Sequence, residues 1–525
     1  MRSGYDTLPP EILGEVFCFS LLHTVVLDEQ SQLHLLTICL VCKAWRDAAH
    51  LNHHLWRGIG QLRIQSRGAL FSHRKAISWL SRSGSLRKSV GITLSCPLQG
   101  WAGCEENQCT GSNAGLAKFL HRVSPMEHLS LEFSGTSECY FNLCASMKRE
   151  SDRSATALRS LDTGTLPLTS LALSFNNTFA LQLGASQSGC LFNTLPPITS
   201  LELRLSSLPF GVANPFVEEL QTHKIFSRSI LRALTSFTIR CDWPLNQLAR
   251  LLEPCVNIEE LTLFIGHSAY FQDPATTESV RRIGVQLPKM RTLRLRHLLP
   301  SAMRLLEILP VNRVTNLDLS FPGSGLWETQ QNVRSCSPFW AAFIRRNADT
   351  LRFIRLHDVK ISSVILLEML PSHLISLETL ILDRVNFNSD VFRHWTLPPI
   401  DVEEGAKWFP KLKTIKILQA FPTFDPEAVF SFLTARRPFH AEPEEGNAIS
   451  FGEPSDGIKQ LVITYQLPIG QGNLVLQAAD EEVESICSAL RRGGMLVHVG
   501  PRYLREFRRR QIPLGAHLTF PSKAN

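Results

Sequence analysis

The sequence predicts an α/β chain with a small helical segment at its N-terminus and a long array of alternating short strands and helices behind it. Three observations lead to this prediction. Apolar side chains recur at helical spacing near the start of the chain. Farther on, the pattern apolar-x-x-apolar-x-apolar recurs again and again as far as residue 465. Finally, 525 residues exceed what one compact core usually holds, which favours several domains or an elongated repeat.

The net charge is located at one end of the chain. From Arg491 onward there are eight Lys or Arg residues and one acidic residue, so the net charge of +7 belongs to this segment and the preceding chain is neutral. We expect a basic C-terminal cap from about residue 491. Its cluster Arg502–Arg510 is predicted to be a solvated tail, and a nuclear-import or phosphate-contact patch is the open alternative.

The sequence also bears on location. It shows no secretory signal and no run of about 18 uncharged apolar residues, so we expect no membrane partner. Thirteen cysteines, an odd number, are scattered along the chain and are typical of reduced intracellular thiols. The expected location is the cytoplasm, the nucleus or both.

The first helix is predicted over Thr7–Phe17. Pro9 and Pro10 fit its first turn, where a backbone N–H has no partner, and Glu11 lies near the positive end of the helix dipole. A second helix is predicted to run through residues 33–51. Polar stretches at 98–115, 147–166 and 439–457 are predicted loops.

Two tryptophans, Trp45 and Trp56, lie eleven residues apart, which is close to three helical turns. They are predicted to share one apolar face. Trp45 would pack the helical segment, and Trp56 would join that segment to the chain that follows.

These N-terminal blocks resemble an F-box over residues 6–57: Leu8-Pro9-x-Glu11-Ile12-Leu13, then Val16-Phe17, then residues 35–49, then Leu55-Trp56. The linker Cys18–Gln32 is longer than in the usual motif. The resemblance implies a three-helix domain over residues 1–60 that docks to a Skp-type adaptor and, through it, to a cullin. By motif position, the residues implied in the adaptor face or in the packing behind it are Leu8, Pro9, Ile12, Leu13, Val16, Val41, Cys42 and Trp45.

A zinc site is a competing interpretation of the same stretch. Cys39 and Cys42 followed by His50, His53 and His54 imitate a Cys2His2 spacing. Cys39 and His50 would lie three turns apart on one helix, however, so the ligands would not converge. We therefore favour a core cysteine with solvated histidines and expect no metal or other cofactor.

The rest of the chain is a repeat. The strand pattern is found at 126–133, 168–175, 198–205, 234–241, 258–265, 290–297, 314–321, 351–358, 377–384, 412–419 and 458–465, with a weaker copy at 90–96. Helices are predicted at 113–123, 245–254, 301–310, 339–348, 362–371, 426–437 and 481–492. Strand followed by helix is typical of a leucine-rich-repeat solenoid, in which stacking supplies the continuous core. We expect about 11–12 units over residues 61–525.

This part resembles the irregular leucine-rich repeats that follow F-boxes. Such repeats usually carry Asn or Cys three residues after the second strand leucine, and only Asn176 meets that pattern. The residues that flank the inward leucines would project onto a concave sheet face. Its basic members are Arg204, Arg240, Arg294, Arg296, Arg355, His357 and Lys416. They suit capture of an acidic or phosphorylated segment. Alternatively, they pair across strands with Glu202, Asp318 and Asp383.

The two resemblances imply the substrate receptor of a cullin–RING ubiquitin ligase, present as one copy in a hetero-complex with an adaptor and an unknown target protein. The sequence shows no Gly-x-Ser-x-Gly elbow, phosphate loop or His-Glu-x-x-His motif, so we expect no catalysis. Cys104 and Cys109 are expected to be isolated thiols. A non-catalytic scaffold or inhibitor remains the alternative function, and nucleic-acid binding is disfavoured because no aromatic platform accompanies the basic cluster.

Overall fold

The fold was analysed in a computed structural model. The residues it describes are 8–21, 27–64, 73–96, 109–123, 125–134, 138–157, 168–176, 198–205, 227–241, 245–264, 278, 285–299, 302–303, 305–309, 311–322, 330–398, 407–421, 424–436, 439–440, 450–451, 457–466, 474–477, 481–500 and 502–505. The chain divides into two compact units, Met1–Phe353 and Ile354–Asn525. Both are α/β, and the predicted fold class is confirmed.

The first unit begins with helices. These are α1 (Pro10–Leu21), α2 (Glu29–Val41) and α3 (Lys43–Leu51), followed by the 3-10 turn η2 (His53–Trp56). The single second helix predicted over residues 33–51 is wrong, because Cys42 has an extended backbone (φ −159°, ψ 171°) that separates α2 from α3. The Cys42 thiol accepts a hydrogen bond from the Trp45 N–H at 3.4 Å and so caps α3.

Parallel strands follow in chain order. They are β1 (Gly58–Ile64), β2 (Lys88–Leu94), β3 (Met126–Phe133), β4 (Ser170–Phe175), β5 (Ser200–Leu205), β6 (Ser236–Arg240), β7 (Glu260–Phe264), β8 (Thr292–Arg296) and β9 (Asn316–Ser320). The other helices of this unit are α4 (His73–Ser81), η4 (Thr110–Ser112), α5 (Ala114–Arg122), α6 (Glu138–Ala157), α8 (Arg228–Ala233), α9 (Leu245–Leu252), α11 (Leu305–Ile308) and α12 (Gln330–Asn347).

The second unit repeats the same plan. Its sheet runs β10 (Phe353–Lys360), β11 (Thr379–Asn386), β12 (Thr414–Ala420), β15 (Gln460–Tyr465) and β17 (Leu496–Val499). Its helices are α13 (Ser363–Met369), α14 (Asp390–His394), α15 (Pro426–Arg436) and α16 (Glu481–Arg492). Two small antiparallel pairs join β13 (Phe439–His440) to β14 (Ser450–Phe451) and β16 (Leu474–Gln477) to β18 (Arg502–Arg505).

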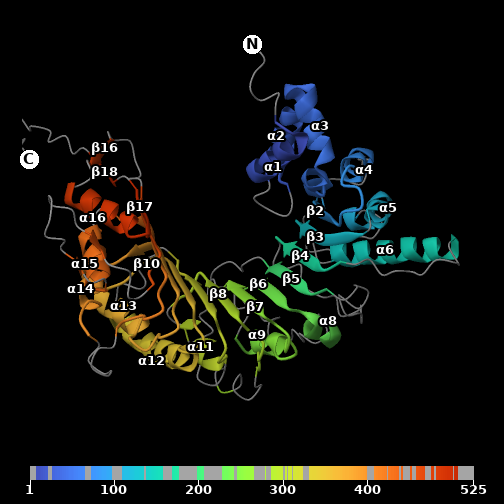
Figure 1. Cartoon of the computed structure of the whole chain (residues 1–525). Coiled ribbons are helices and arrows are strands. Elements are labelled where there is room, and N and C mark those ends of the chain that lie inside the picture. The colour runs from blue at the N-terminus through green and yellow to red at the C-terminus, as the bar shows by residue number, and fades with distance from the viewer. Residues whose placement is uncertain are drawn as a thin grey trace, which may run out of the picture. The chain divides into compact units, whose positions relative to one another are not determined.

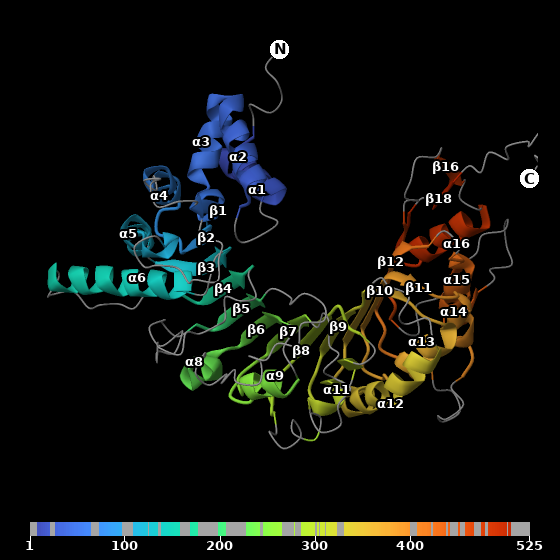
Figure 2. The ribbon, with the colours of Figure 1, turned by 180° about the vertical axis from the view of Figure 1, so that it is seen from behind.

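The core of each unit lies between sheet and helices, because alternate strand residues point to opposite faces. In the first unit one buried row passes through residues that pair in register from strand to strand: Leu129, Leu171, Leu201, Phe237, Leu261, Leu293 and Leu317. Figures 1 and 2 show helices along one face of the sheet in each unit, and no described helix covers the other face. We call this uncovered side the open face.

The strand prediction was accurate, and the misses have local causes. β1 and β17 were not predicted. Gly58 and Gly60 break the apolar pattern at the start of β1, and β17 has only four residues. The loop predicted over 147–166 is wrong as far as Ala157, because α6 continues through these polar residues. β13 and β14 likewise occupy part of the loop predicted at 439–457. Of the basic cluster Arg502–Arg510, β18 takes the first four residues, and 506–510 lie outside the described residues.

Left-handed backbone recurs where strands end. His297, Asp358, Arg384 and Gln419 have φ between 50° and 60°, and each lies two residues after the second inward residue of its repeat. Asn176 takes another role in its repeat, because its side-chain amide donates to the Glu132 carboxylate at 2.9 Å. Among the described helices none is long and apolar enough to cross a bilayer.

Candidate functional site

Helix α1 carries apolar side chains on two opposite stripes. Leu13, Phe17 and Leu21 are buried against the other helices. Four exposed apolar residues follow one another at about one helical turn on the other side: Leu8, Ile12, Val16 and Phe19. Phe19 is 84% exposed. A helix that only covered a core would need the first stripe alone.

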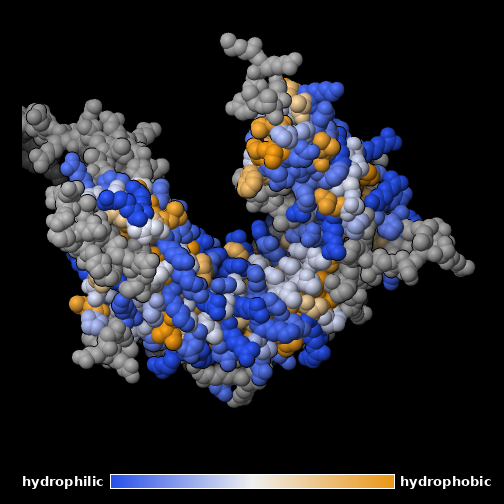
Figure 3. Space-filling view, in the orientation of Figure 1, coloured by the Kyte–Doolittle hydropathy of each residue, from blue (hydrophilic) through white to orange (hydrophobic). Residues whose placement is uncertain are grey.

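Helix α2 repeats this arrangement. Its buried side consists of Leu35, Ile38 and Cys39. Its exposed apolar residues are Leu33, Leu36, Leu40 and, at the C-terminal end, Val41; Leu40 is 82% exposed. Figure 3 shows hydrophobic atoms gathered at the surface of the N-terminal helices. We call the exposed apolar residues of α1 and α2, with Leu8, the apolar face.

The residues implied by the F-box resemblance divide into two groups. Leu8, Pro9, Ile12, Val16, Val41 and Cys42 are exposed. Leu13 is buried, and the half-buried Trp45 ring packs on Phe17 with ring centroids 5.2 Å apart. The helices come close because α1 has Gly14 where it meets α3: a Cβ there would lie 3.1 Å from two side-chain atoms of Asn52.

Trp56 does not share a helix face with Trp45, because α3 ends at Leu51 and Trp56 lies in η2. Its predicted role as the joint to the repeats is confirmed. The buried ring packs edge-on against Trp79 of α4 at 4.7 Å, and its Nε1–H donates to the Ala49 carbonyl at 2.7 Å. The Arg82 guanidinium lies 4.5 Å above the same ring.

A second link joins α2 to the sheet. The Gly60 N–H of β1 donates to the Leu27 carbonyl at 2.9 Å. The Gln32 amide donates to the carbonyls of Leu27 and Gly60 at 2.8 and 3.2 Å. The helical segment and the first repeat are thus held together by both hydrogen bonds and ring packing.

The competing zinc pattern does not assemble in the part of the chain that the structure describes. Cys39 is buried inside α2, and burial raises the pKa of its thiol, which disfavours the thiolate that zinc needs. Cys42 is exposed and caps α3. His50 stacks on Trp56 with centroids 5.1 Å apart, and His53 Nδ1 lies 2.6 Å from the Arg82 carbonyl.

Residues 5–61 match the family model described as F-box-like. The chain carries an F-box-like domain. The match includes α1, α2, α3 and η2 and therefore all of the apolar face. Of the apolar face, the resemblance in sequence had implicated Leu8, Ile12, Val16 and Val41, and it missed Phe19, Leu33, Leu36 and Leu40. A periodicity search for a second apolar stripe on each helix would have found them.

No curated protein matches the sequence. Among solved structures, one similar chain is described as the crystal structure of a TLR13–ssRNA13 complex. The identity is 13%, the TM-score is 0.34, and the similarity covers 78% of this chain and 50% of the other. The chain thus spans about half the length of that structure.

The open face of the first unit carries four of the predicted basic residues. Arg296 donates two hydrogen bonds to the Asp318 carboxylate, at 2.6 and 2.9 Å, and Arg294 pairs with Glu260 at 3.0 Å. Arg204 pairs with Glu202 of its own strand at 2.6 Å and is largely exposed. Arg240, next to Arg204 in strand register, is exposed and has no ion-pair partner among the described residues.

The other three predicted basic residues lie on the second unit. Arg355 donates to the Asp383 carboxylate at 2.5 Å, and His357 Nε2 lies 3.9 Å from the same oxygen. Burial lowers the pKa of His357, while the charge of Asp383 opposes that shift. Lys416 is half-buried on β12. The charges here are therefore largely balanced within the sheet.

Proposed function

We propose that the chain is the substrate-recognition subunit of an SCF-type ubiquitin ligase and works in the cytoplasm or nucleus. The F-box-like domain would dock to a Skp-type adaptor and through it to a cullin. The repeats would bind a target protein. The chain would contribute proximity, by holding target and ligase in one assembly, and no chemistry.

The observation that carries the proposal is the apolar face on α1 and α2. Burying a Leu, Ile or Phe side chain stabilises a complex by roughly 1.5–3 kcal/mol. Large apolar side chains that stay exposed on two short helices do not stabilise the isolated chain. They suit an interface with a partner protein that buries them. A helical cap of the repeats, as in the scaffold alternative, would not require this second stripe.

The joint between the domains supports the same function. Trp56, Trp79 and Arg82 form one packed cluster between η2 and α4, and Gln32 bridges α2 and β1. A rigid joint keeps the bound target at a constrained position relative to the adaptor, which raises the effective concentration of its lysines.

For target binding, Arg204 and Arg240 of the first unit are the exposed residues among the seven predicted basic ones. Arg204, Arg240 and Phe264 occupy neighbouring register positions on β5, β6 and β7. Arg296 continues this row but is held by Asp318. We infer that Arg204 and Arg240 contact an acidic segment of the target and that Arg294 and Arg296 shape the surface around them. Arg355, His357 and Lys416 lie on the second unit and are separate candidates for target contact there.

Adaptor docking is tested with the full-length chain and a purified Skp-type adaptor. Ile12→Asp should weaken binding at least about tenfold, because it places a charge in an apolar contact. The pair Leu8→Ala and Pro9→Ala should also weaken it. The matched control is Val364→Asp, which changes an apolar residue on α13 that is even more exposed than Ile12. Equal affinity of Ile12→Asp and the control would contradict adaptor docking through the apolar face.

Target capture is tested separately. Arg204→Glu with Arg240→Glu should remove a subset of co-purified proteins while the adaptor is retained in full. Arg345→Glu, at an exposed position of α12, is the control. If the double variant recovers the same proteins in the same amounts, the target does not use these two arginines.

A further inference from the structure

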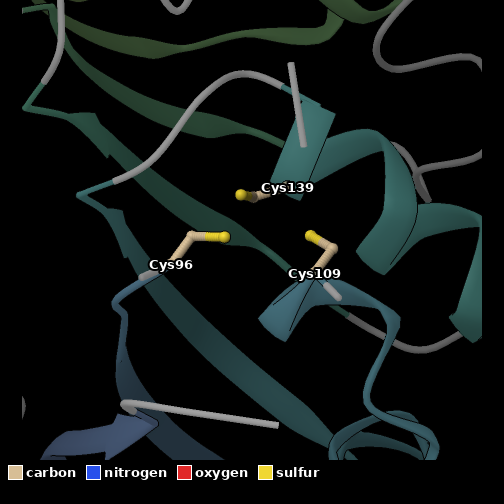
Figure 4. A group of neighbouring side chains, drawn as sticks. All are labelled: Cys96, Cys109 and Cys139. Carbon is tan, nitrogen blue, oxygen red and sulfur yellow. The ribbon is translucent and has the colours of Figure 1, made fainter. Parts of the chain in front are cut away.

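Three cysteines that are far apart in the sequence lie together in the first unit. Cys96 follows β2, Cys109 precedes η4, and Cys139 is the second residue of α6. Their Sγ atoms all lie within 4.8 Å of one another, and all three residues are buried. Figure 4 shows the three sulfur atoms turned toward a common point. The expectation that Cys109 is an isolated thiol is wrong, and Cys104 lies outside the described residues.

We propose that Cys96, Cys109 and Cys139 bind one zinc ion. Thiolate sulfur is the donor that thiophilic ions such as zinc prefer. Sulfur atoms that share a tetrahedral zinc ion at about 2.3 Å lie roughly 3.8 Å apart. The three thiols therefore need to close by at most about 1 Å, which side-chain rotation supplies. Zinc releases three protons on binding and takes one further ligand, such as water.

The surroundings favour negatively charged sulfur at two of the three positions. The Cys109 Sγ accepts a hydrogen bond from the Gly111 N–H at 3.3 Å. Cys139 lies in the first turn of a 20-residue helix, where the dipole and the unpaired N–H groups favour a negative charge. Both features offset part of the charge that three thiolates bring to a single divalent ion.

The backbones of η4 and α6 approach each other closely at Gly111. A Cβ on Gly111 would lie 2.0 Å from the carbonyl oxygen of Cys139, so only glycine lets η4 touch the start of α6. Gly111 is thus a positioning residue: it brings Cys109 to Cys139. A zinc ion there would tie together the end of β2, η4 and α6, which are three separate segments of the early repeats.

The test uses the full-length chain, purified under reducing conditions. Metal analysis should find about one zinc per chain, and Co²⁺ added to the metal-free protein should give a sulfur-to-cobalt charge-transfer band that one equivalent of Zn²⁺ removes. Zinc should also raise the melting temperature, because it binds the folded state. Cys139→Ser should lose the zinc, the band and the thermal shift.

Two further variants keep the result interpretable. Cys144→Ser, five residues along α6 and outside the cluster, should retain zinc. Gly111→Ala keeps every thiol and should still weaken zinc binding at least about tenfold, as is usual when ligand positioning is lost. The proposal is overturned if the reduced wild-type chain gives no cobalt band, if copper(I) is found there in place of zinc, or if Cys139→Ser retains as much zinc as Cys144→Ser.

Discussion

The F-box-like domain and the open face of the sheet differ in whether their surface side chains have partners within the chain. On α1 and α2, large apolar side chains are exposed to water on the side of each helix that lies opposite a buried apolar stripe. On the open face, polar and charged groups meet partners of the chain itself, as Arg296 meets Asp318 and Arg355 meets Asp383. Among the described residues, the apolar face has no covering partner within the chain, whereas most charged groups of the open face are paired with one another.

This difference separates two kinds of binding. Covering an exposed apolar surface with a matching apolar surface lowers the free energy of the complex. Such a surface therefore suits a constant partner such as an adaptor. A sheet whose charges are mostly paired has to exchange existing contacts for new ones, which favours selectivity over strength. Under the proposed function, the helices would bind the adaptor and the sheet would bind the target protein.

The largest expected effect separates the buried and exposed sides of the F-box-like domain. Trp56→Ala should lower the free energy of unfolding by about 3–5 kcal/mol, because it leaves a cavity beside Trp79. Phe19→Ala should change it by less than about 0.5 kcal/mol, since that ring is exposed. Urea unfolding followed by circular dichroism measures both. A large loss with Phe19→Ala would mean that the apolar face already has a partner within the chain.

The next effect concerns charge pairs on the open face. A double-mutant cycle on Arg296 and Asp318 should give a coupling of about 1–3 kcal/mol, because the pair is bidentate and mostly buried. The exposed pair Arg204 and Glu202 is the control and should give less than about 0.5 kcal/mol. Equal coupling energies would mean that Arg204 is held by its partner as firmly as Arg296 and is no more available to a target.

A smaller effect depends on pH. Burial lowers the pKa of His128, whose Nδ1 lies 2.9 Å from the Ser170 hydroxyl, and charges of Glu202 and Glu127 oppose the shift. The unfolded chain then binds more protons than the folded chain near the usual histidine pKa, so stability falls as the pH drops through that range. His128→Gln should flatten the stability profile between about pH 7 and pH 5.5. An unchanged slope would contradict a role for His128.

The smallest effect tests the left-handed residues at the strand ends. Gln419 has φ 50°, a conformation that glycine adopts without strain. Gln419→Gly should leave the free energy of unfolding unchanged or raise it by up to about 1 kcal/mol. Lys416→Gly in the same strand should lower it by about 1 kcal/mol. Thermal unfolding compares the two, and an equal loss at both positions would show that the backbone at Gln419 is not strained.

The sequence predicted the repeats because their signal is local and recurrent. A pair such as Leu293-x-Leu295 specifies a strand with one buried face, and the next copy specifies its neighbour. Where the signal weakens, the prediction failed. The polar segment of α6 has no apolar periodicity after residue 147, and the break between α2 and α3 depends on one residue, Cys42.

The candidate site was only partly predictable. The motif positions located α1, but which side of α1 is covered depends on the packing that buries Leu13 and Phe17 and leaves Ile12 exposed. Pairings such as Arg355 with Asp383 join residues 28 positions apart, so no local pattern shows them. The cysteine cluster is the extreme case, because Cys96, Cys109 and Cys139 meet only once the strands have stacked.

The central claim is that the apolar face is a docking surface for a Skp-type adaptor. Isothermal titration of the purified full-length chain with that adaptor, at several temperatures, tests it most directly. The account predicts a 1:1 complex with micromolar or tighter affinity and a negative heat-capacity change, the mark of apolar burial. A correctly folded chain that gives no binding heat at any of these temperatures, and no complex on gel filtration, would contradict it.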